Sequence, residues 1–384
     1  MSKASTAPGP LLLMSLVVAL AAATWPSVAA DFINRGPFAV GIQLAEVPKA
    51  SGNRNLDTLV WYPAAGPIPD PASASRAVRL LGTKDAPPAT TGPFPLVVLI
   101  HGLGGGGGSY ALWGQQLASY GFVVIAGDYD IDPQSGTDPV PSPEDHVAVH
   151  LLHERPADVL QEIAYADQLT APGGRLAGVI DTSHIGVWGH STGGSTALQA
   201  AGAQIDFKAL NAWCADKGSD SRAQETCQFV GHEPPVAALY GATDAFAAPM
   251  PPLWDKRVSA LVLAAPGGEL HAFGDAGIAS VKVPTLIMVS AADTMVKPEY
   301  NALWAYGAIG SASKTLAVFA DGSHTMFLDC CGYYAKRDGP RLDELKALTT
   351  AFFLDILKND QAGRAALGPE TVSFPGLTYQ TTLQ

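Results

Sequence analysis

The residue most able to do chemistry is a serine framed by two glycines in the pattern GxSxG, at residues 189–193 (GHSTG). It follows an apolar run at 185–188 (IGVW) and precedes a run of small residues at 195–203. A tight strand-to-helix turn accepts only small side chains at Gly189 and Gly193, and it exposes the serine hydroxyl where the helix dipole favours negative charge. The pattern predicts that Ser191 is a nucleophile; the alternative is a glycine-rich turn with an incidental serine.

A serine hydroxyl is a weak nucleophile near neutral pH, so a histidine must take its proton and a carboxylate must orient that histidine. With this type of turn the chain order is serine, acid, histidine. Asp293 ends the run 285–293 (TLIMVSAAD), and His324 follows the run 315–320 (TLAVFA). We expect these two residues to complete a triad. The alternatives are a turn or N-cap aspartate and a solvated loop histidine.

Other acids and histidines compete for these roles. Asp321 and Asp275 are the reserve candidates for the acid, whereas His271 precedes Asp293 and is out of order for the base. His190 lies inside the turn and is expected to point into packing.

Attack on a carbonyl creates an oxyanion, which needs two preformed hydrogen-bond donors. One is expected to be the backbone N–H of Thr192, directly after the nucleophile. The other should come from the loop 101–105 (HGLGG), with Leu103 as the candidate. The glycine run 104–108 also suggests phosphate binding, but no GxxxxGK[ST] spacing follows, so this alternative is weak.

His146, His150 and His153 have the spacing i, i+4 and i+7, which aligns three potential metal ligands on one helix face. Apolar residues between them fit a half-buried helix equally well. We predict no metal site and no cofactor.

Short apolar runs alternate with helical patterns, which indicates an α/β fold with a mostly parallel sheet and helices on both faces. Expected strands are residues 59–62, 95–100, 122–126, 185–188, 260–265, 285–290 and 315–319. Expected helices are residues 110–120, 155–170, 195–203 and 342–358. Residues 63–95 are rich in Pro, Ala and Gly and are expected to form a long surface loop.

Residues 31–384 are expected to form one domain, since α/β folds reach this size with insertions. The interval 206–259 interrupts the alternation and contains a Pro, Met and aromatic-rich stretch at 245–254. It predicts a cap inserted over the carboxyl edge of the sheet. The alternative is an ordinary surface excursion.

Residues 1–30 have the pattern of a signal peptide, with Lys3, an apolar run at 11–23 and small residues up to Ala30. The apolar run is short for a membrane span, so a membrane-anchoring helix is the weaker alternative. We expect cleavage after Ala30 and a secreted or periplasmic protein without a stable membrane anchor.

Four cysteines remain after export, and an even number in an oxidising compartment predicts two disulfides. Cys214 and Cys227 are expected to pair. The adjacent Cys330 and Cys331 leave open a vicinal bridge or crossed links to the first pair. A metal site built from the four is disfavoured because the spacing of zinc ribbons is missing.

The net charge of the chain limits the kinds of partner that it can bind. The 384 residues carry 23 Lys and Arg against 35 Asp and Glu, and no basic cluster occurs. This balance argues against binding to nucleic acid or to an anionic membrane surface.

Several segments resemble the platelet-activating-factor acetylhydrolase-like and predicted dienelactone-hydrolase-like group of α/β-hydrolases. They are VWYPA at Val60, LVVLIHGLGG at Leu96, LASYGFVV at Leu117, RPADV at Arg155, IGVWGHSTGGSTAL at Ile185 and VPTLIMVSAAD at Val283. The resemblance implies the α/β-hydrolase fold and cofactor-free ester hydrolysis, with Ser191, Asp293 and His324 as the triad and Leu103 and Thr192 as oxyanion donors. The long glycine run and GDYD at Gly127 depart from the group. True dienelactone hydrolases use a cysteine nucleophile, which this site lacks.

Together these features predict a secreted serine carboxylic ester hydrolase that forms an acyl-enzyme. Its expected substrate is a small-molecule or polymeric ester of short-chain, lipid-like or aromatic character. The alternatives are a catalytically silent binding protein of the same fold and an amidase or peptidase with the same triad.

Overall fold

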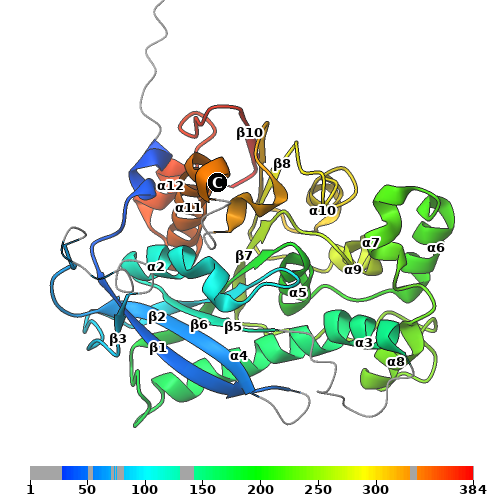
Figure 1. The fold of residues 1–384 in the computed structure, drawn as a ribbon, viewed down its shortest axis with the longest axis horizontal. Coiled ribbons are helices and arrows are strands. Elements are labelled where there is room, and N and C mark those ends of the chain that lie inside the picture. The colour runs from blue at the N-terminus through cyan, green and yellow to red at the C-terminus, as the bar shows by residue number, and fades with distance from the viewer. Residues whose placement is uncertain are drawn as a thin grey trace, which may run out of the picture.

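A computed structural model describes residues 28–50, 55–70, 73, 75, 82–129, 142–328 and 335–383 (Figure 1). Most of the expected signal peptide, up to residue 27, lies outside the described residues, as do Cys330 and Cys331. The expected cleavage point after Ala30 falls within the short helix η1 (Val28–Ile33).

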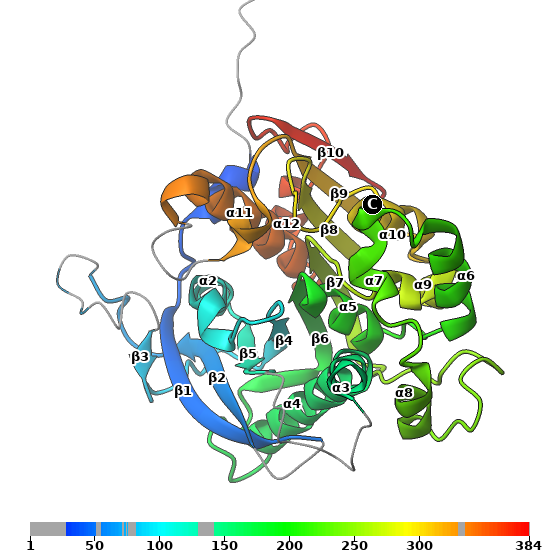
Figure 2. The same cartoon turned by 45° about the vertical axis from the view of Figure 1, so that its right-hand side comes forward.

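Ten described strands form a single sheet. They are β1 (Ala39–Pro48), β2 (Asn55–Ala64), β3 (Thr83–Lys84), β4 (Phe94–Ile100), β5 (Val123–Gly127), β6 (Ile180–His190), β7 (Val258–Ala264), β8 (Thr285–Ser290), β9 (Lys314–Phe319) and β10 (Leu377–Thr381). Their order across the sheet is β10-β9-β8-β7-β6-β4-β5-β2-β1-β3 (Figure 2).

The direction of the strands fixes where a site can form. Strands β4 to β9 run parallel to one another, while β2 and β10 join this block antiparallel at its two sides. From β4 the chain moves to β5 on one side and then crosses to β6 on the other. Loops after β4 and β6 therefore diverge, and such a switch point leaves a crevice at the carboxyl edge of the sheet.

Helices and helical turns of the described residues connect and cover these strands. They are η2 (Gly107–Tyr110), α2 (Ala111–Ser119), α3 (Pro143–Val149), η3 (His150–Glu154), α4 (Arg155–Thr170), α5 (Thr192–Ala200), α6 (Phe207–Lys217), η4 (Ser221–Ala223), α7 (Gln224–Cys227), α8 (Glu233–Leu239), η5 (Leu270–Ala272), α9 (Gly274–Ile278), α10 (Ala302–Ala308), η6 (His324–Phe327), α11 (Ala335–Lys358) and α12 (Gln361–Ala366).

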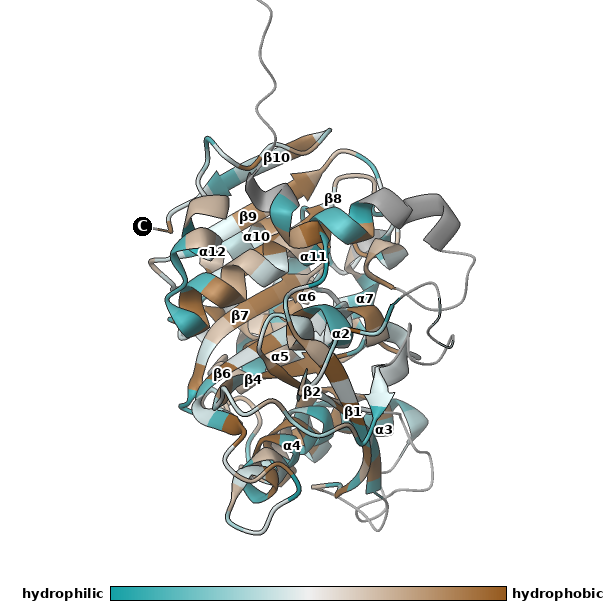
Figure 3. Cartoon of the chain, turned by 90° about the vertical axis from the view of Figure 1, so that its left-hand side faces the viewer, coloured by the Kyte–Doolittle hydropathy of each residue, from teal (hydrophilic) through white to brown (hydrophobic). Residues whose placement is uncertain are grey.

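The central strands are sandwiched between two layers of helices. Helix α2 contacts β2 and β5, and α11 contacts β6, β7 and β8; α4 and α5 contact each other and cover the opposite face (Figure 2). Every residue of β4 and β8 is buried, as expected for strands covered on both sides. Figure 3 shows these apolar strands between helices that alternate apolar and polar residues.

Helices α3 and α4 are joined through η3, a turn of π-helix. Pro156 explains this irregularity because it has no N–H to bond the carbonyl of Leu152 and its ring crowds that carbonyl. The freed Leu152 carbonyl accepts a hydrogen bond of 2.8 Å from the Tyr240 hydroxyl. The helix therefore continues with one widened turn directly before Arg155.

Most predicted elements are present, with shifted ends. The first predicted helix, 110–120, is shorter at both ends, and the helix after Ser191 begins at Thr192 rather than at residue 195. Strand β8 ends at Ser290, so Asp293 lies in the following turn and does not end the strand as predicted. The strand predicted at 260–265 also stops one residue early, at Ala264, because Ala265 adopts a positive φ of 42°.

The outer strands were not predicted from the sequence. Strands β3 and β10 are the two edge strands of the sheet, and β1 lies next to β3. In β10 half-buried and exposed residues alternate, so no long apolar run marks it. The predicted loop at 63–95 was therefore wrong at both ends and at β3, although its middle is loop where it is described.

The interval 206–259 contains α6, η4, α7 and α8, followed by a long irregular segment up to β7. A disulfide joins Cys214 in α6 to Cys227 in α7, as predicted. Figure 1 shows α6 and α7 on the side of the molecule where α9 and α10 also lie. The interpretation of this interval as a cap stays a prediction. Among the described residues, no helix is long and apolar enough to cross a membrane.

Candidate active site

Ser191 lies between the end of β6 and the start of α5 in a strained backbone conformation, with φ 56° and ψ −126°. A non-glycine residue in this region costs on the order of 1–3 kcal/mol, so neighbouring structure must hold it there. The Ser191 N–H donates to the carbonyl of Ala264 on the adjacent strand, at 3.0 Å. Ser191 itself is only partly buried.

The two glycines of the motif are required by close backbone packing. A Cβ atom at Gly189 would stand 2.1 Å from the carbonyl oxygen of Gly193, and one at Gly193 would stand 2.3 Å from that of Ile100. Real Cβ atoms do not approach backbone so closely. The turn therefore packs directly on the end of β4, at the crevice that the strand order creates.

Asp293 and His324 are brought together from separate loops. His324 Nδ1 lies 2.7 Å from Asp293 Oδ2, and both side chains are almost fully buried. Asp293 Oδ1 accepts the backbone N–H groups of Met295 and Val296, each at 2.9 Å. The carboxylate is thus held on both oxygens and fixes the ring of His324 with Nδ1 protonated, which leaves Nε2 as a proton acceptor.

The reserve candidates are occupied elsewhere. Asp321 is exposed and pairs with Arg341, while Asp275 accepts from the indole N–H of Trp304. The ring of His271 stacks on Trp213 at a centroid distance of 3.9 Å. None of the three is joined to His324 by a hydrogen bond in the described structure.

A hydrogen-bonded chain links the serine turn to the backbone of His324. His190 Nε2 donates to the carbonyl of His324 at 2.9 Å, and its Nδ1 accepts from the Tyr110 hydroxyl at 2.7 Å. Burial and the neighbouring His324 hold the pKa of His190 well below its usual range, so the ring is neutral. His190 is therefore buried as expected, but in a polar network. The Ser191 hydroxyl makes no hydrogen bond to a described residue, and such contacts often tighten only with substrate.

Leu103 and Thr192 lie on two segments that meet at Ser191, the loop after β4 and the start of α5. A Cβ at Gly102 would lie 3.1 Å from Ser191 Cβ, which places the loop after β4 beside the serine. Within the described part of the chain, neither the Leu103 nor the Thr192 N–H donates to a protein acceptor. Both are thus free to bind an oxyanion. Leu103 exposes 57% of its surface to solvent.

The glycine run packs against β5 and is not arranged as a phosphate cradle. Gly107 N–H donates to Asp128 Oδ1 at 2.6 Å, and a Cβ at Gly106 would lie 2.7 Å from the same oxygen. Asp128, the first aspartate of GDYD, therefore holds the glycine loop in place through this hydrogen bond. A carboxylate at this position would repel a phosphate.

The three histidines of the α3–α4 region do not gather around one point. His150 Nδ1 lies 3.2 Å from Glu154, and its Nε2 lies 3.1 Å from the carbonyl of Tyr129. His153 packs edge-on against Tyr240. Among the described residues, no group of three or more His, Cys, Asp and Glu is arranged to hold a metal ion.

Two residues near the site were missed. Arg155 is fully buried and donates to the carbonyl of His101 and, at 3.1 Å, to Thr192 Oγ1. Glu225 of α7 is half-buried and interacts electrostatically with His324 and Asp293; burial raises its pKa, while His324 lowers it. The RPADV segment drew attention to Arg155 without a role, and nothing in the sequence marked Glu225.

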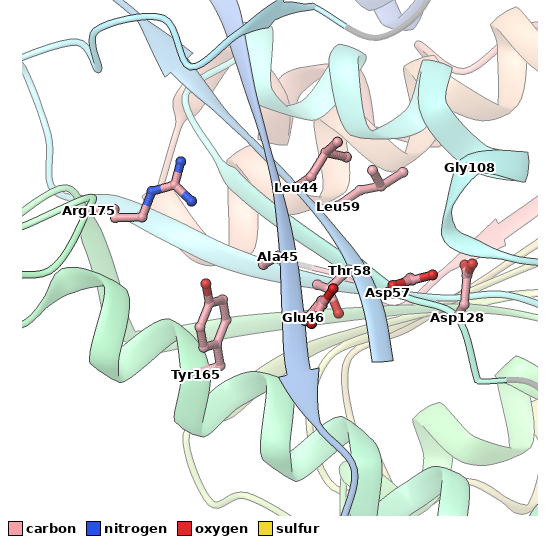
Figure 4. A pocket seen from close by; sticks show the side chains of 10 residues that line it. All are labelled: Leu44, Ala45, Glu46, Asp57, Thr58, Leu59, Gly108, Asp128, Tyr165 and Arg175. Atoms are coloured by element: carbon pink, nitrogen blue, oxygen red, sulfur yellow. The ribbon is translucent and has the colours of Figure 1, made fainter. Parts of the chain in front are cut away.

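One hollow of about 780 Å³ lies away from this constellation (Figure 4). Side chains of β1, β2 and α4 line it together with Gly108, Asp128 and Arg175. Neither Ser191, Asp293 nor His324 borders it, so it forms no part of the candidate active site.

A family model described as "Alpha/beta hydrolase family" matches residues 97–336, the span from β4 into the start of α11. This span contains the serine turn, Asp293 and His324, and the parallel sheet around them has the predicted fold. Membership of this family supports hydrolase activity. The chain belongs to the alpha/beta hydrolase family.

Proposed function

We propose that this chain is a serine hydrolase of carboxylic esters that works through an acyl-enzyme. The observation that carries the proposal is the buried Asp293–His324 pair, 2.7 Å apart, whose histidine is hydrogen-bonded to His190, the neighbour of a serine held at φ 56°. A nucleophile, an oriented base and a fixed acid are the parts that acyl transfer requires.

In the first half of the proposed cycle, Ser191 Oγ attacks the ester carbonyl carbon while its proton passes to His324 Nε2. The carbonyl oxygen becomes an oxyanion and accepts the N–H groups of Leu103 and Thr192. When the tetrahedral intermediate collapses, the bond to the alcohol breaks and His324 returns the proton to the leaving oxygen. Water then repeats the sequence on the acyl-enzyme and releases the acid.

Apolar surface beside the site favours a substrate with an apolar acyl or aryl part. Leu103 and Met295 expose 57% and 62% of their surfaces, and Met295 follows Asp293 by two residues. Exposed residues of this type are suited to bind hydrocarbon. The resemblance to the platelet-activating-factor acetylhydrolase-like group also supports an ester.

We propose export as well. The Cys214–Cys227 disulfide is typical of oxidising compartments, and it accompanies the signal-like pattern of residues 1–30. A secreted or periplasmic enzyme would meet small-molecule or polymeric esters outside the cell.

The test is a panel of p-nitrophenyl esters of increasing acyl length, an aromatic diester and a p-nitroanilide matched to the best ester. Wild type is expected to hydrolyse at least one ester faster than its matched anilide. Ser191→Ala should reduce that rate by roughly 10⁵-fold or more, whereas Ser183→Ala, an exposed serine on the same strand, should not. Preferred turnover of the anilide would favour an amidase, and no turnover by folded wild type would favour a binding protein.

A further inference from the structure

Arg155 is the first residue of α4, and its side chain is completely buried. Burying a guanidinium is costly, and both terminal nitrogens of Arg155 are used, while its Nε has no hydrogen-bond partner among the described residues. Nη2 donates to the carbonyl of His101, and Nη1 donates to Thr192 Oγ1 at 3.1 Å. The guanidinium also lies over the ring of Tyr129, 5.5 Å from its centroid, and interacts with the buried carboxyl of Glu269.

The two acceptors belong to the two sides of the candidate oxyanion site. His101 follows β4, and Thr192 follows Ser191 at the start of α5. The planar guanidinium therefore joins one residue on each side of this site. Such a fork holds two acceptors at a fixed separation, which a flexible ammonium group does not do.

The peptide between His101 and Gly102 is held at both ends. Arg155 binds its carbonyl, and its N–H donates to the Tyr110 hydroxyl at 3.3 Å. The next N–H along the chain is that of Leu103. Fixing this peptide plane thus fixes the start of the segment that presents the Leu103 N–H.

The widened turn at η3 accounts for the placement of Arg155. It comes directly before Arg155 and results from Pro156, so it alters the direction in which Arg155 leaves the helix. A regular helix through 143–170 would point this side chain elsewhere.

We propose that Arg155 is a positioning residue for the oxyanion hole. Its single guanidinium fixes the position of the Leu103 N–H relative to the Thr192 N–H. The inference rests on the proposed serine hydrolase chemistry. Arg155 does not touch substrate and acts through the two backbone segments that it joins.

The test compares Arg155→Met, Arg155→Lys and wild type in three measurements. The first is the second-order rate constant for phosphonylation by a fluorophosphonate, which requires the oxyanion donors but no particular ester. The second is the labelled fraction at the end of that reaction, which counts folded sites. The third is kcat and KM on the best ester of the panel. Arg257→Met is the control, because Arg257 is partly exposed and pairs with Asp167 and Asp255.

Arg155→Met is expected to lower both the phosphonylation rate and kcat by about 10- to 100-fold, with KM changed by less than about threefold and the labelled fraction unchanged. Arg155→Lys should be intermediate, and Arg257→Met should match wild type. Rates per labelled site within about twofold of wild type would overturn the proposal, since a purely structural role lowers only the labelled fraction.

Thr192→Val provides a second test if Arg155→Met does not fold. It removes one acceptor, keeps the side-chain volume and should slow phosphonylation by roughly 3- to 10-fold; an unchanged rate would overturn the proposal. If wild type is phosphonylated but hydrolyses no ester, the proposed ester hydrolysis fails, and the phosphonylation rates still decide the role of Arg155.

Discussion

Replacing Asp293 by Asn should disable the base while leaving its surroundings in place. Oδ1 of Asp293 accepts two backbone N–H groups, from Met295 and Val296, at 2.9 Å each. An asparagine must place its carbonyl oxygen at the position of Oδ1, because its NH2 group in that position would face two backbone N–H donors without an acceptor. Its NH2 group then faces His324 Nδ1, 2.7 Å away in the wild type.

The consequence for His324 is a changed tautomer. Nδ1 must accept from the asparagine, so the proton moves to Nε2, the nitrogen that should take the proton from Ser191. Loss of the correct tautomer in this arrangement lowers kcat by about 10⁴-fold, or about 5 kcal/mol of transition-state stabilisation. Both backbone hydrogen bonds to the side chain survive, so the free energy of unfolding should change by about 1 kcal/mol or less.

The assay is initial-rate hydrolysis of the best p-nitrophenyl ester, with urea unfolding of the same samples. Asp321→Asn is the matched control, because Asp321 lies three residues before His324 but is exposed and bound to Arg341. It should retain wild-type kcat within about twofold. The assignment of the acid is wrong if Asp293→Asn keeps more than a tenth of wild-type kcat. It is also wrong if kcat falls as far in Asp321→Asn as in Asp293→Asn.

Three further predictions concern the turn, a buried carboxyl and the charge beside the site. Gly193→Ala should lower the melting temperature and abolish esterase activity, because its Cβ would stand 2.3 Å from the Ile100 carbonyl oxygen. Gly108→Ala, with open space around it, should match wild type. If both variants lose the same amount of activity, the close packing at Gly193 is not the cause. Burial raises the pKa of Glu162 to about 8, from an ordinary value of 4.5. The folded state therefore holds this proton while the unfolded chain releases it, so the free energy of unfolding falls as pH rises from about 4.5 to about 8. In urea titrations at pH 5 and 8, wild type should lose on the order of a few kcal/mol of its free energy of unfolding, and Glu162→Gln should not show this loss. If wild type and Glu162→Gln differ by the same free energy of unfolding at both pH values, the prediction is wrong. Glu225→Gln should raise kcat/KM for an anionic hemisuccinate ester over a neutral ester by roughly 3- to 10-fold; an unchanged ratio would show that this carboxylate does not reach the substrate.

The centre of the fold was predictable because burial leaves a mark on it. Strands β4 and β8 are covered on both faces and are continuous apolar runs, so the sequence predicts them to within a residue. The edge strand β10 has five residues, none of them fully buried, so no continuous apolar run marks it in the sequence. Helices α7 and α8, of 4 and 7 residues, carry too few turns to show periodicity. Helix α6 is longer, but it buries only Phe207 and Leu210 and therefore has no apolar stripe along its length.

The candidate site was predictable where local backbone geometry demands particular residues. Gly189 and Gly193 are necessary because backbone atoms occupy the space of their missing Cβ atoms, and this requirement locates Ser191. Asp293 and His324 followed from chain order, even though β8 ends before Asp293. Arg155 could not be assigned, because its two partners, His101 and Thr192, are distant in the chain and come together only after the paired strands β4 and β6 end. Its direction also depends on the widened turn η3, which was not predicted from Pro156 at the level of the sequence.

The most direct measurement of the central claim is to identify the residue that a fluorophosphonate modifies. Wild type is incubated with the probe, digested and sequenced by mass spectrometry, and Ser191→Ala and Ser183→Ala are treated in parallel. We predict one phosphonylated peptide in wild type, modified at Ser191, the same peptide in Ser183→Ala and no modification in Ser191→Ala. Equal labelling of Ser191→Ala, or modification of a different serine in wild type, would contradict the assignment of Ser191 as the nucleophile.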